Sequence, residues 1–154
     1  MKNRTLIATV TAMSLITAAA FAHGGATGIV KERMDGMMAM GKALGSVANI
    51  FKGEAKYDVE NIEAAAAIIK EHALEIEKLF PDTHDSRKGK GTEALPSIWE
   101  NQDDFNAIAR ELAKRSDEMA EGAKTNDEAQ LKASFANLAK TCSGCHRDYR
   151  KSKN

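Results

Sequence analysis

Apolar residues recur at alternating spacings of three and four over two stretches of the N-terminal half, which is the spacing that lines one face of an α-helix. The first stretch predicts a helix that ends near Gly53, because glycine is favoured just beyond a helix C-terminus. Its predicted buried stripe comprises Val30, Met34, Met37, Gly41, Leu44, Ala48 and Phe51. The second stretch predicts a helix that is capped by Asp58 and stops at Pro81. Its stripe comprises Val59, Ile62, Ala66, Ile69, Ala73, Ile76 and Phe80.

Polar and turn-forming residues dominate residues 82–97, which predicts a loop that crosses between the two halves of the protein. A third helix is then expected to begin at Asn101, with Asp103 and Asp104 in its first turn, and to end at Gly122. Its apolar positions are Phe105, Ile108, Leu112 and Met119.

A fourth helix is predicted to begin with a capping box formed by Thr125 and Glu128. Its apolar stripe comprises Leu131, Phe135, Leu138, Cys142, Cys145 and Tyr149. Both cysteines therefore lie in the apolar seam, so we expect their chemistry to take place inside the fold.

Four amphipathic helices with short outer connections and one longer central crossing predict an all-α fold, an antiparallel up-down four-helix bundle. The low aromatic content and the abundance of Ala, Glu and Lys favour helices as well. Neither an internal repeat nor a low-complexity segment argues for another architecture.

The N-terminus has the composition of a secretory signal peptide, which we place at residues 1–22. A basic start is followed by an apolar run over residues 6–21 and by the A-x-A cleavage site that ends at Ala22. The run is shorter than the roughly 18 residues that a membrane span requires, so we expect no membrane span. The mature domain would cover residues 23–154 and act in the periplasm. The 22 basic residues match the 22 acidic ones, so no excess of positive charge favours nucleic acid.

The sequence Cys142-x-x-Cys145-His146 is the attachment signature of a c-type haem. Cysteines three positions apart on a helix share one face, so both thiols can reach one porphyrin edge, and the histidine follows where it can bind iron. A thioredoxin-like redox pair would need a βαβ pattern, and a structural zinc site would need two further ligands. A plain disulfide would leave His146 unexplained. Haem c is therefore the predicted cofactor.

The chain resembles the class II c-type cytochromes, which include cytochrome c prime and its low-spin relatives, over nearly the whole mature domain. The residues that carry the resemblance are Cys142-x-x-Cys145-His146-x-x-Tyr149-Arg150, Arg33-x-x-x-Met37, Leu79-Phe80-Pro81 and Ala94-Leu95-Pro96-Ser97-Ile98-Trp99. The resemblance implies a left-handed bundle with haem c near one end and His146 as the proximal iron ligand. It further implies that Arg33 lies by a haem propionate and that Arg150 lies near the exposed edge of the His146 ring.

Methionines cluster in the first helix, at Met34, Met37, Met38 and Met40. Met37 lies in the apolar stripe, matches the distal position of the family, and precedes Gly41, whose small size leaves room for a flat cofactor. If the Met37 thioether binds iron, the haem is six-coordinate and low-spin, which is the outcome we expect. If it only packs over the iron, the haem is five-coordinate and open to a small gas. Met34 and Met40 are expected to fill the core, and Met38 to face outward.

The leading hypothesis is a periplasmic electron carrier with a single covalent haem c and with periplasmic proteins as redox partners. The sequence contains no catalytic dyad, phosphate loop or nucleophile constellation, so an enzyme is not expected. The alternative is a gas-binding module that takes nitric oxide or carbon monoxide at a five-coordinate iron. A copper-handling protein that uses the methionine cluster is a third reading. A homodimer through the first two helices is possible, because some relatives dimerise in this way.

Overall fold

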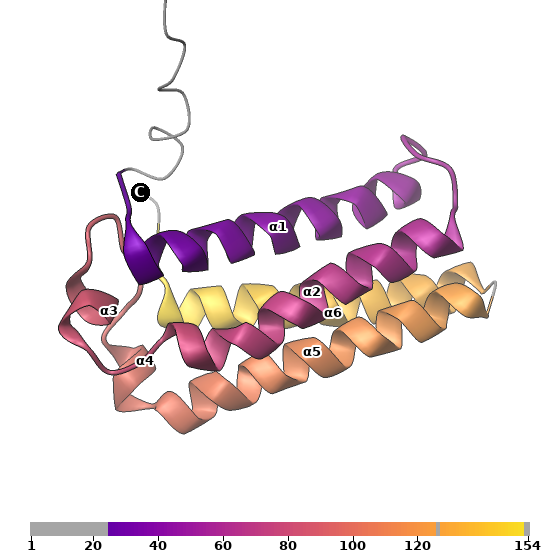
Figure 1. The fold of residues 1–154 in the computed structure, drawn as a ribbon. Coiled ribbons are helices and arrows are strands. Elements are labelled where there is room, and N and C mark those ends of the chain that lie inside the picture. The colour runs from indigo at the N-terminus through magenta and orange to yellow at the C-terminus, as the bar shows by residue number, and fades with distance from the viewer. Residues whose placement is uncertain (1–24, 126, 153–154) are drawn as a thin grey trace, which may run out of the picture.

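Four long helices make up most of the computed structural model, which describes residues 25–125 and 127–152 (Figure 1). They are α1 (Gly28–Phe51), α2 (Val59–Leu79), α5 (Gln102–Lys124) and α6 (Glu128–Tyr149). Successive long helices run in opposite directions, and the short helices α3 (His84–Lys88) and α4 (Ser97–Glu100) lie at one end of the bundle. The all-α four-helix bundle expected from the sequence is confirmed. The predicted signal peptide lies outside the described residues.

Local signals fix several helix ends as the sequence predicts. Asp58 caps α2, where its carboxylate accepts hydrogen bonds from the amides of Glu60 and Asn61. Gly53 follows α1 with a φ of 75°, in the left-handed region that favours glycine, and its amide donates to the Ile50 carbonyl at 3.0 Å. Both predicted boundaries are confirmed.

The boundary between the last two long helices differs from the prediction. Asp127 caps α6, since its carboxylate accepts from the amides of Ala129 and Gln130 at 2.9 and 3.1 Å. The expected capping box of Thr125 is wrong, because the Thr125 hydroxyl donates to the Gly122 carbonyl at 2.8 Å. Gly122 does not end α5 either. It lies inside that helix, where a Cβ would come within 3.0 Å of Ser134 Oγ on α6.

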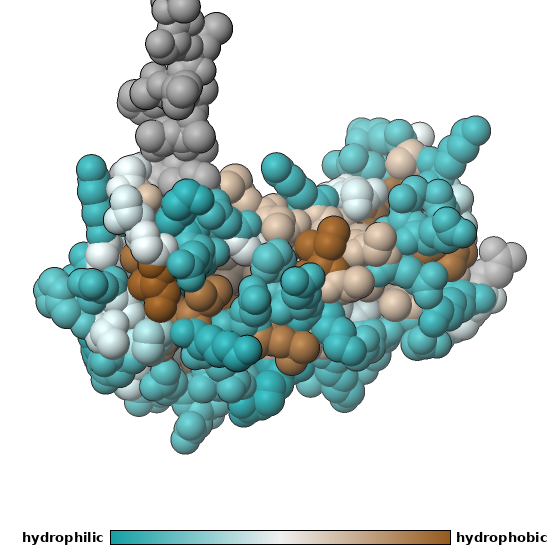
Figure 2. Space-filling model, in the orientation of Figure 1, coloured by the Kyte–Doolittle hydropathy of each residue, from teal (hydrophilic) through white to brown (hydrophobic). Residues whose placement is uncertain are grey.

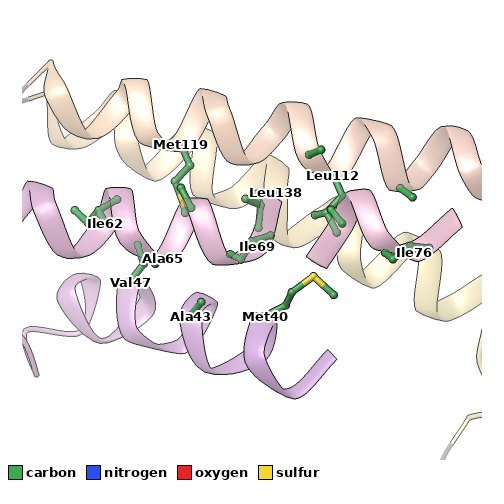
Figure 3. Close-up of a cluster of buried hydrophobic side chains, with 14 of the residues drawn as sticks. Met40, Ala43, Val47, Ile62, Ala65, Ile69, Ile76, Leu112, Met119 and Leu138 are labelled. Atoms are coloured by element: carbon green, nitrogen blue, oxygen red, sulfur yellow. The ribbon is translucent and has the colours of Figure 1, made fainter. Parts of the chain in front are cut away.

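The buried face of α1 is displaced by about one residue from the predicted stripe. The buried residues of α1 are Val30, which the predicted stripe includes, and Arg33, Gly36, Met40, Ala43 and Val47, each of which lies one position before a predicted residue. Figure 3 shows Met40, Ala43 and Val47 on the side of α1 that faces α2, and all three belong to the same buried cluster as Ile62, Ala65 and Ile69. The predicted positions Met34, Met37 and Gly41 line a cavity on the neighbouring face of the helix. Therefore α1 has two apolar faces, and the sequence pattern identified the one that faces the cavity.

The segment between α2 and α5 is more ordered than the predicted loop over residues 82–97. It contains α3, which Thr83 caps by accepting a hydrogen bond from the Ser86 amide at 3.3 Å. The following stretch, residues 89–96, is called the crossing segment below. At its start, Gly89 comes so close to its neighbours that a Cβ would lie 2.7 Å from Val30 Cγ2 and 2.5 Å from the Asp85 carbonyl oxygen.

The four long helices do not pack against one another equally. The close pairs are α1 with α2, α2 with α5, and α5 with α6, whereas the backbones of α1 and α6 rarely approach each other. These last two helices meet at the end of the bundle far from α3, where the rings of Phe51 and Phe135 pack edge to face at 5.1 Å. At the other end the seam between them is open. No helix in the described part of the chain is long and apolar enough to cross a membrane.

Replacing Gly89 by alanine is expected to destabilise the protein by about 1–3 kcal/mol, because the new methyl group would overlap a backbone carbonyl and Val30. Gly45→Ala is the matched control, since a Cβ there meets no atom within 4 Å. In the middle of α1 it should stabilise by about 0.5–1 kcal/mol. Urea unfolding followed by circular dichroism measures both. Equal stability of Gly89→Ala and the unsubstituted protein would contradict the close approach of α3 to α1.

Candidate functional site

A cavity of about 570 Å³ lies in the open part of the seam between α1 and α6. Its volume is within the range of about 300–1,000 Å³ that is typical of cofactor and ligand sites. Helix α1 supplies Val30, Arg33, Met34, Met37, Met38, Gly41 and Lys42 to its walls, and α6 supplies Cys145, His146 and Tyr149. Gly91, Thr92, Glu93 and Ala94 of the crossing segment and Arg150, just after α6, complete the rim. Most of the wall is apolar, as a flat hydrophobic cofactor requires.

The two cysteines lie one turn apart on α6 and both pack against the core. Burial raises the pKa of the Cys142 thiol. Burial, together with the nearby Cys142 and Asp148, raises the pKa of Cys145 to about 11. Cys145 lines the cavity, and Cys142 lies one turn further into the bundle. The predicted position of the pair in the apolar seam is confirmed.

His146 lines the same cavity from the last turn of α6. Partial burial lowers the pKa of its imidazole, the positive charge of Arg150 lowers it further, and the negative charge of Glu93 raises it. Iron binds the neutral ring, so a lowered pKa increases the fraction of His146 that is ready to bind a metal near neutral pH.

Met37 reaches the cavity from the opposite side, on α1, and is half-buried. Gly41 follows one turn later, and a Cβ there would meet no atom within 4 Å, so the expected room beside Met37 exists. Met40 is buried in the core and Met38 is 41% exposed, which confirms both predictions. Met34 lines the cavity, so the expectation that it fills the core is wrong.

Arg33 is only 6% exposed although its side chain is charged. Its Nη1 donates to the Ser86 carbonyl at 2.9 Å, Nη2 donates to the Ser86 hydroxyl, and Nε donates to the Leu79 carbonyl. Its Cζ lies 3.9 Å from the centroid of the Phe80 ring. Burial lowers the pKa of the guanidinium to about 10. Arg33 thus ties α1 to the end of α2 and to α3 while it lines the cavity, a structural role that the sequence did not reveal.

A row of aromatic rings lies beside the cavity. The ring centroids of Phe80 and Phe105 are 4.9 Å apart, and those of Phe105 and Tyr149 are 5.2 Å apart, both edge to face. All three side chains line the cavity wall. Trp99 packs near Phe80 and donates from its indole nitrogen to the carbonyls of Phe80 and Pro81, at 3.2 and 3.1 Å. These contacts hold α4 against the end of α2.

The crossing segment is also joined to the end of α6. The Leu95 amide donates to the Tyr149 carbonyl at 3.0 Å, and the Lys151 amide donates to the Glu93 carbonyl at 2.8 Å. The Arg150 side chain pairs with the Glu93 carboxylate at 2.7 Å. Sequence reasoning missed Glu93, because this contact joins residues 57 positions apart and leaves no local pattern.

The residues that surround the cavity fit a covalent c-type haem. Cys145 and His146 line the cavity from α6, Cys142 lies one turn earlier on the same helix, the Met37 thioether lines the cavity from α1, and most of the wall is apolar. A family model described as Cytochrome C' matches residues 28–150. The chain belongs to the cytochrome c' family. The haem c predicted from the cysteine motif is confirmed by this membership, and proteins of the family are haem-binding carriers or gas-binding proteins.

Curated relatives of this cytochrome c' family member carry two kinds of name. A cytochrome c-556 of Agrobacterium tumefaciens (strain II Chrys) is 36% identical over 123 residues, which cover 79% of this chain and 97% of the relative. A cytochrome c' of Rhodopseudomonas palustris is 34% identical over 127 residues, which cover 82% of this chain and 84% of the relative. The solved structure of cytochrome c' from R. palustris has a TM-score of 0.76 at 33% identity, and the match covers 83% of this chain and 99% of that one.

Gly41→Leu is expected to lower the yield of haem-loaded protein severalfold, because the new side chain would enter the space beside Met37 that the family's cofactor needs. Gly45→Leu, one turn along the same helix and outside the cavity wall, is the matched control. The haem absorbance per mole of purified polypeptide measures the yield. Equal loading of the two variants would contradict the assignment of this cavity to the cofactor.

Proposed function

We propose that this chain is a periplasmic electron carrier in which Cys142 and Cys145 attach one haem c and His146 and Met37 are the axial ligands of its iron. The haem, when bound, supplies one-electron exchange between Fe(III) and Fe(II). The observation that carries the proposal is that Met37 and His146 reach one cavity from the two helices on either side of it. Neither residue needs to cross a packed core to reach a metal there.

The chain's own residues set the redox behaviour of this site. The lowered pKa of His146 keeps its imidazole neutral, in the form that ligates a metal. A thioether such as that of Met37 is a ligand that raises the reduction potential. The apolar wall excludes water, which disfavours the more highly charged Fe(III) state and acts in the same direction.

Arg33 is proposed to face a haem propionate, as the resemblance implies. A buried guanidinium without a carboxylate beside it is costly, and the lowered pKa of Arg33 reflects that cost. A propionate at the cavity wall would offset it. The Leu79 carbonyl and the Ser86 hydroxyl and carbonyl already orient the guanidinium, so its plane would be fixed before the anion binds.

The proposed location and partners follow from the export signal and from the surface of the bundle. Partners would be periplasmic redox proteins that approach the cavity mouth, where Met38 and Lys42 lie. Figure 2 shows apolar side chains at several places on a mostly hydrophilic face, including the end of the bundle near α3. Ile68 and Leu74 on α2 are exposed and offer apolar area for a homodimer that involves the first two helices. We assign no substrate turnover to this site.

Gas binding is the second candidate function, and a specific observation favours it. Among similar solved structures is a nitric oxide complex of a variant cytochrome c prime from Alcaligenes xylosoxidans, 26% identical with a TM-score of 0.71, which covers 81% of this chain. If Met37 packs over the iron without ligating it, the same cavity would admit nitric oxide or carbon monoxide.

The absorption spectrum of the holoprotein separates the two candidates. Electron transfer predicts sharp low-spin bands, a sulfur-to-iron charge-transfer band and indifference to carbon monoxide. Met37→Ala should abolish the charge-transfer band and let carbon monoxide bind to the reduced protein. Met34→Ala and Met38→Ala are matched controls that should keep the band, because their side chains line the same cavity without being the proposed ligand. Broad high-spin bands that shift with carbon monoxide before any substitution would favour the gas-binding function.

Arg33→Gln is expected to lower the midpoint potential, because removing a positive charge beside a propionate favours Fe(III). It should also cost about 1–3 kcal/mol of unfolding free energy, since it leaves buried carbonyls without a donor. Ser86→Ala removes the hydroxyl from the same cluster but no charge, so it should destabilise the protein without moving the potential. Potentiometric titration and urea unfolding measure the two effects. An unchanged potential in Arg33→Gln would contradict the propionate assignment.

A further inference from the structure

The ion pair between Glu93 and Arg150 lies beside His146, and the proposed function leaves it without a role. Arg150 follows α6 directly, and its amide donates to the His146 carbonyl at 3.2 Å, so the two residues are one helical turn apart. Arg150 Nε lies 2.7 Å from Glu93 Oε2, and both side chains are partly exposed, at 37% and 41%. Both residues, together with His146, line the cavity.

Holding the crossing segment in place does not require this ion pair. The backbone hydrogen bonds of Leu95 to Tyr149 and of Lys151 to Glu93 join the two segments by main-chain atoms alone. The Ser97 hydroxyl adds a bond to the Asp148 carbonyl at 3.1 Å. A half-exposed ion pair contributes little to stability in any case. The place of this ion pair beside His146 is consistent with an electrostatic role in addition to its contacts.

The two charges act on the imidazole in opposite directions. Arg150 brings a positive charge and Glu93 a negative charge to the wall of the cavity that His146 also lines. A lone arginine at this place would present a full positive charge to the iron ligand, whereas the pair presents a dipole whose effect falls off faster with distance. A lone arginine would also repel the iron more strongly after oxidation, which increases the charge of the iron by one unit. The negative charge of Glu93 weakens this repulsion.

We propose that Glu93 is a positioning residue that fixes Arg150 beside His146 and offsets its charge there, and that it thereby lowers the reduction potential of the site. The inference rests on the part of the proposed function that makes His146 an iron ligand, and it does not depend on Met37. In the measured step one electron passes from the electrode to Fe(III) and gives Fe(II).

The test is a potentiometric titration of the holoprotein and its variants. Glu93→Gln should raise the midpoint potential, seen as a severalfold higher Fe(II) to Fe(III) ratio at a fixed solution potential. A tenfold change in that ratio corresponds to 59 mV for one electron. Arg150→Gln should lower the potential, and the double variant should return close to the unsubstituted value. This reversal depends on the pair itself and would not follow from a general loss of stability.

Glu128→Gln is the matched control. It also removes one negative charge from an ion pair, the one with Lys132, but it lies 18 residues before His146 on α6, about 27 Å along the helix axis. Equal potentials in Glu93→Gln and Glu128→Gln would overturn the proposal, as would a double variant that keeps the full shift of Glu93→Gln. The absorption spectrum of each sample is an independent check. If the unsubstituted protein lacks the sulfur-to-iron charge-transfer band, the proposed carrier function is contradicted. The potentials of the Glu93 and Arg150 variants would still test the present proposal, because it does not depend on Met37.

Discussion

A bundle that admits a flat cofactor between two of its helices cannot close all of its helix seams, and the rest of this structure follows from that constraint. The packing of α2 against α5 and of each against its outer neighbour carries the core. The rings of Phe51 and Phe135 join α1 and α6 at the end of the bundle far from α3, and the cavity lies between the same two helices nearer the α3 end. The crossing segment and side chains of the other helices, including Ile76 and Phe105, line the rest of the cavity.

Arg33 is the residue through which this open end keeps a defined shape. Apolar side chains alone could slide along α2, whereas the guanidinium fixes α1 to two carbonyls and a hydroxyl in specific directions. The interaction places a buried charge at the wall, and the lowered pKa shows that burial is unfavourable to it. The Arg33 side chain therefore has two roles. It fixes the helix that carries Met37, and it places a positive charge at the cavity wall, where an anion could bind.

Features with a local cause were predictable from the sequence. The period of α2, its cap at Asp58 and the attachment motif on α6 depend on residues within a few positions of each other. The face of α1 that packs in the core was not predictable, because side chains that contact a cofactor have the same hydropathy as side chains that contact a helix. The prediction of the α6 cap was wrong for another reason. Thr125 and Asp127 are both good cap residues, and the tertiary structure determines which of them caps the helix.

Contacts between distant segments could not be predicted at all. Ser86 lies 53 positions from Arg33, and Glu93 lies 57 positions from Arg150. Each pair combines residues that are ordinary on a solvated surface. Whether Met37 ligates iron was also beyond the sequence, because a thioether that packs over a metal and one that binds it share the same position in the pattern.

The two backbone hydrogen bonds between the crossing segment and the end of α6 have a consequence for how the molecule can vary. They join Glu93 and Leu95, which precede α5, to Lys151 and Tyr149 at the end of α6. Helices α5 and α6 therefore form one unit whose two ends are bonded together, and this unit carries both thiols and the imidazole. The half that contains α1 supplies the side chains of the opposite wall and is laid against it. Substitutions in α1 therefore alter the wall that faces Cys145 and His146 while the helix that carries these two residues keeps its contacts. The two sides of the cavity can vary separately.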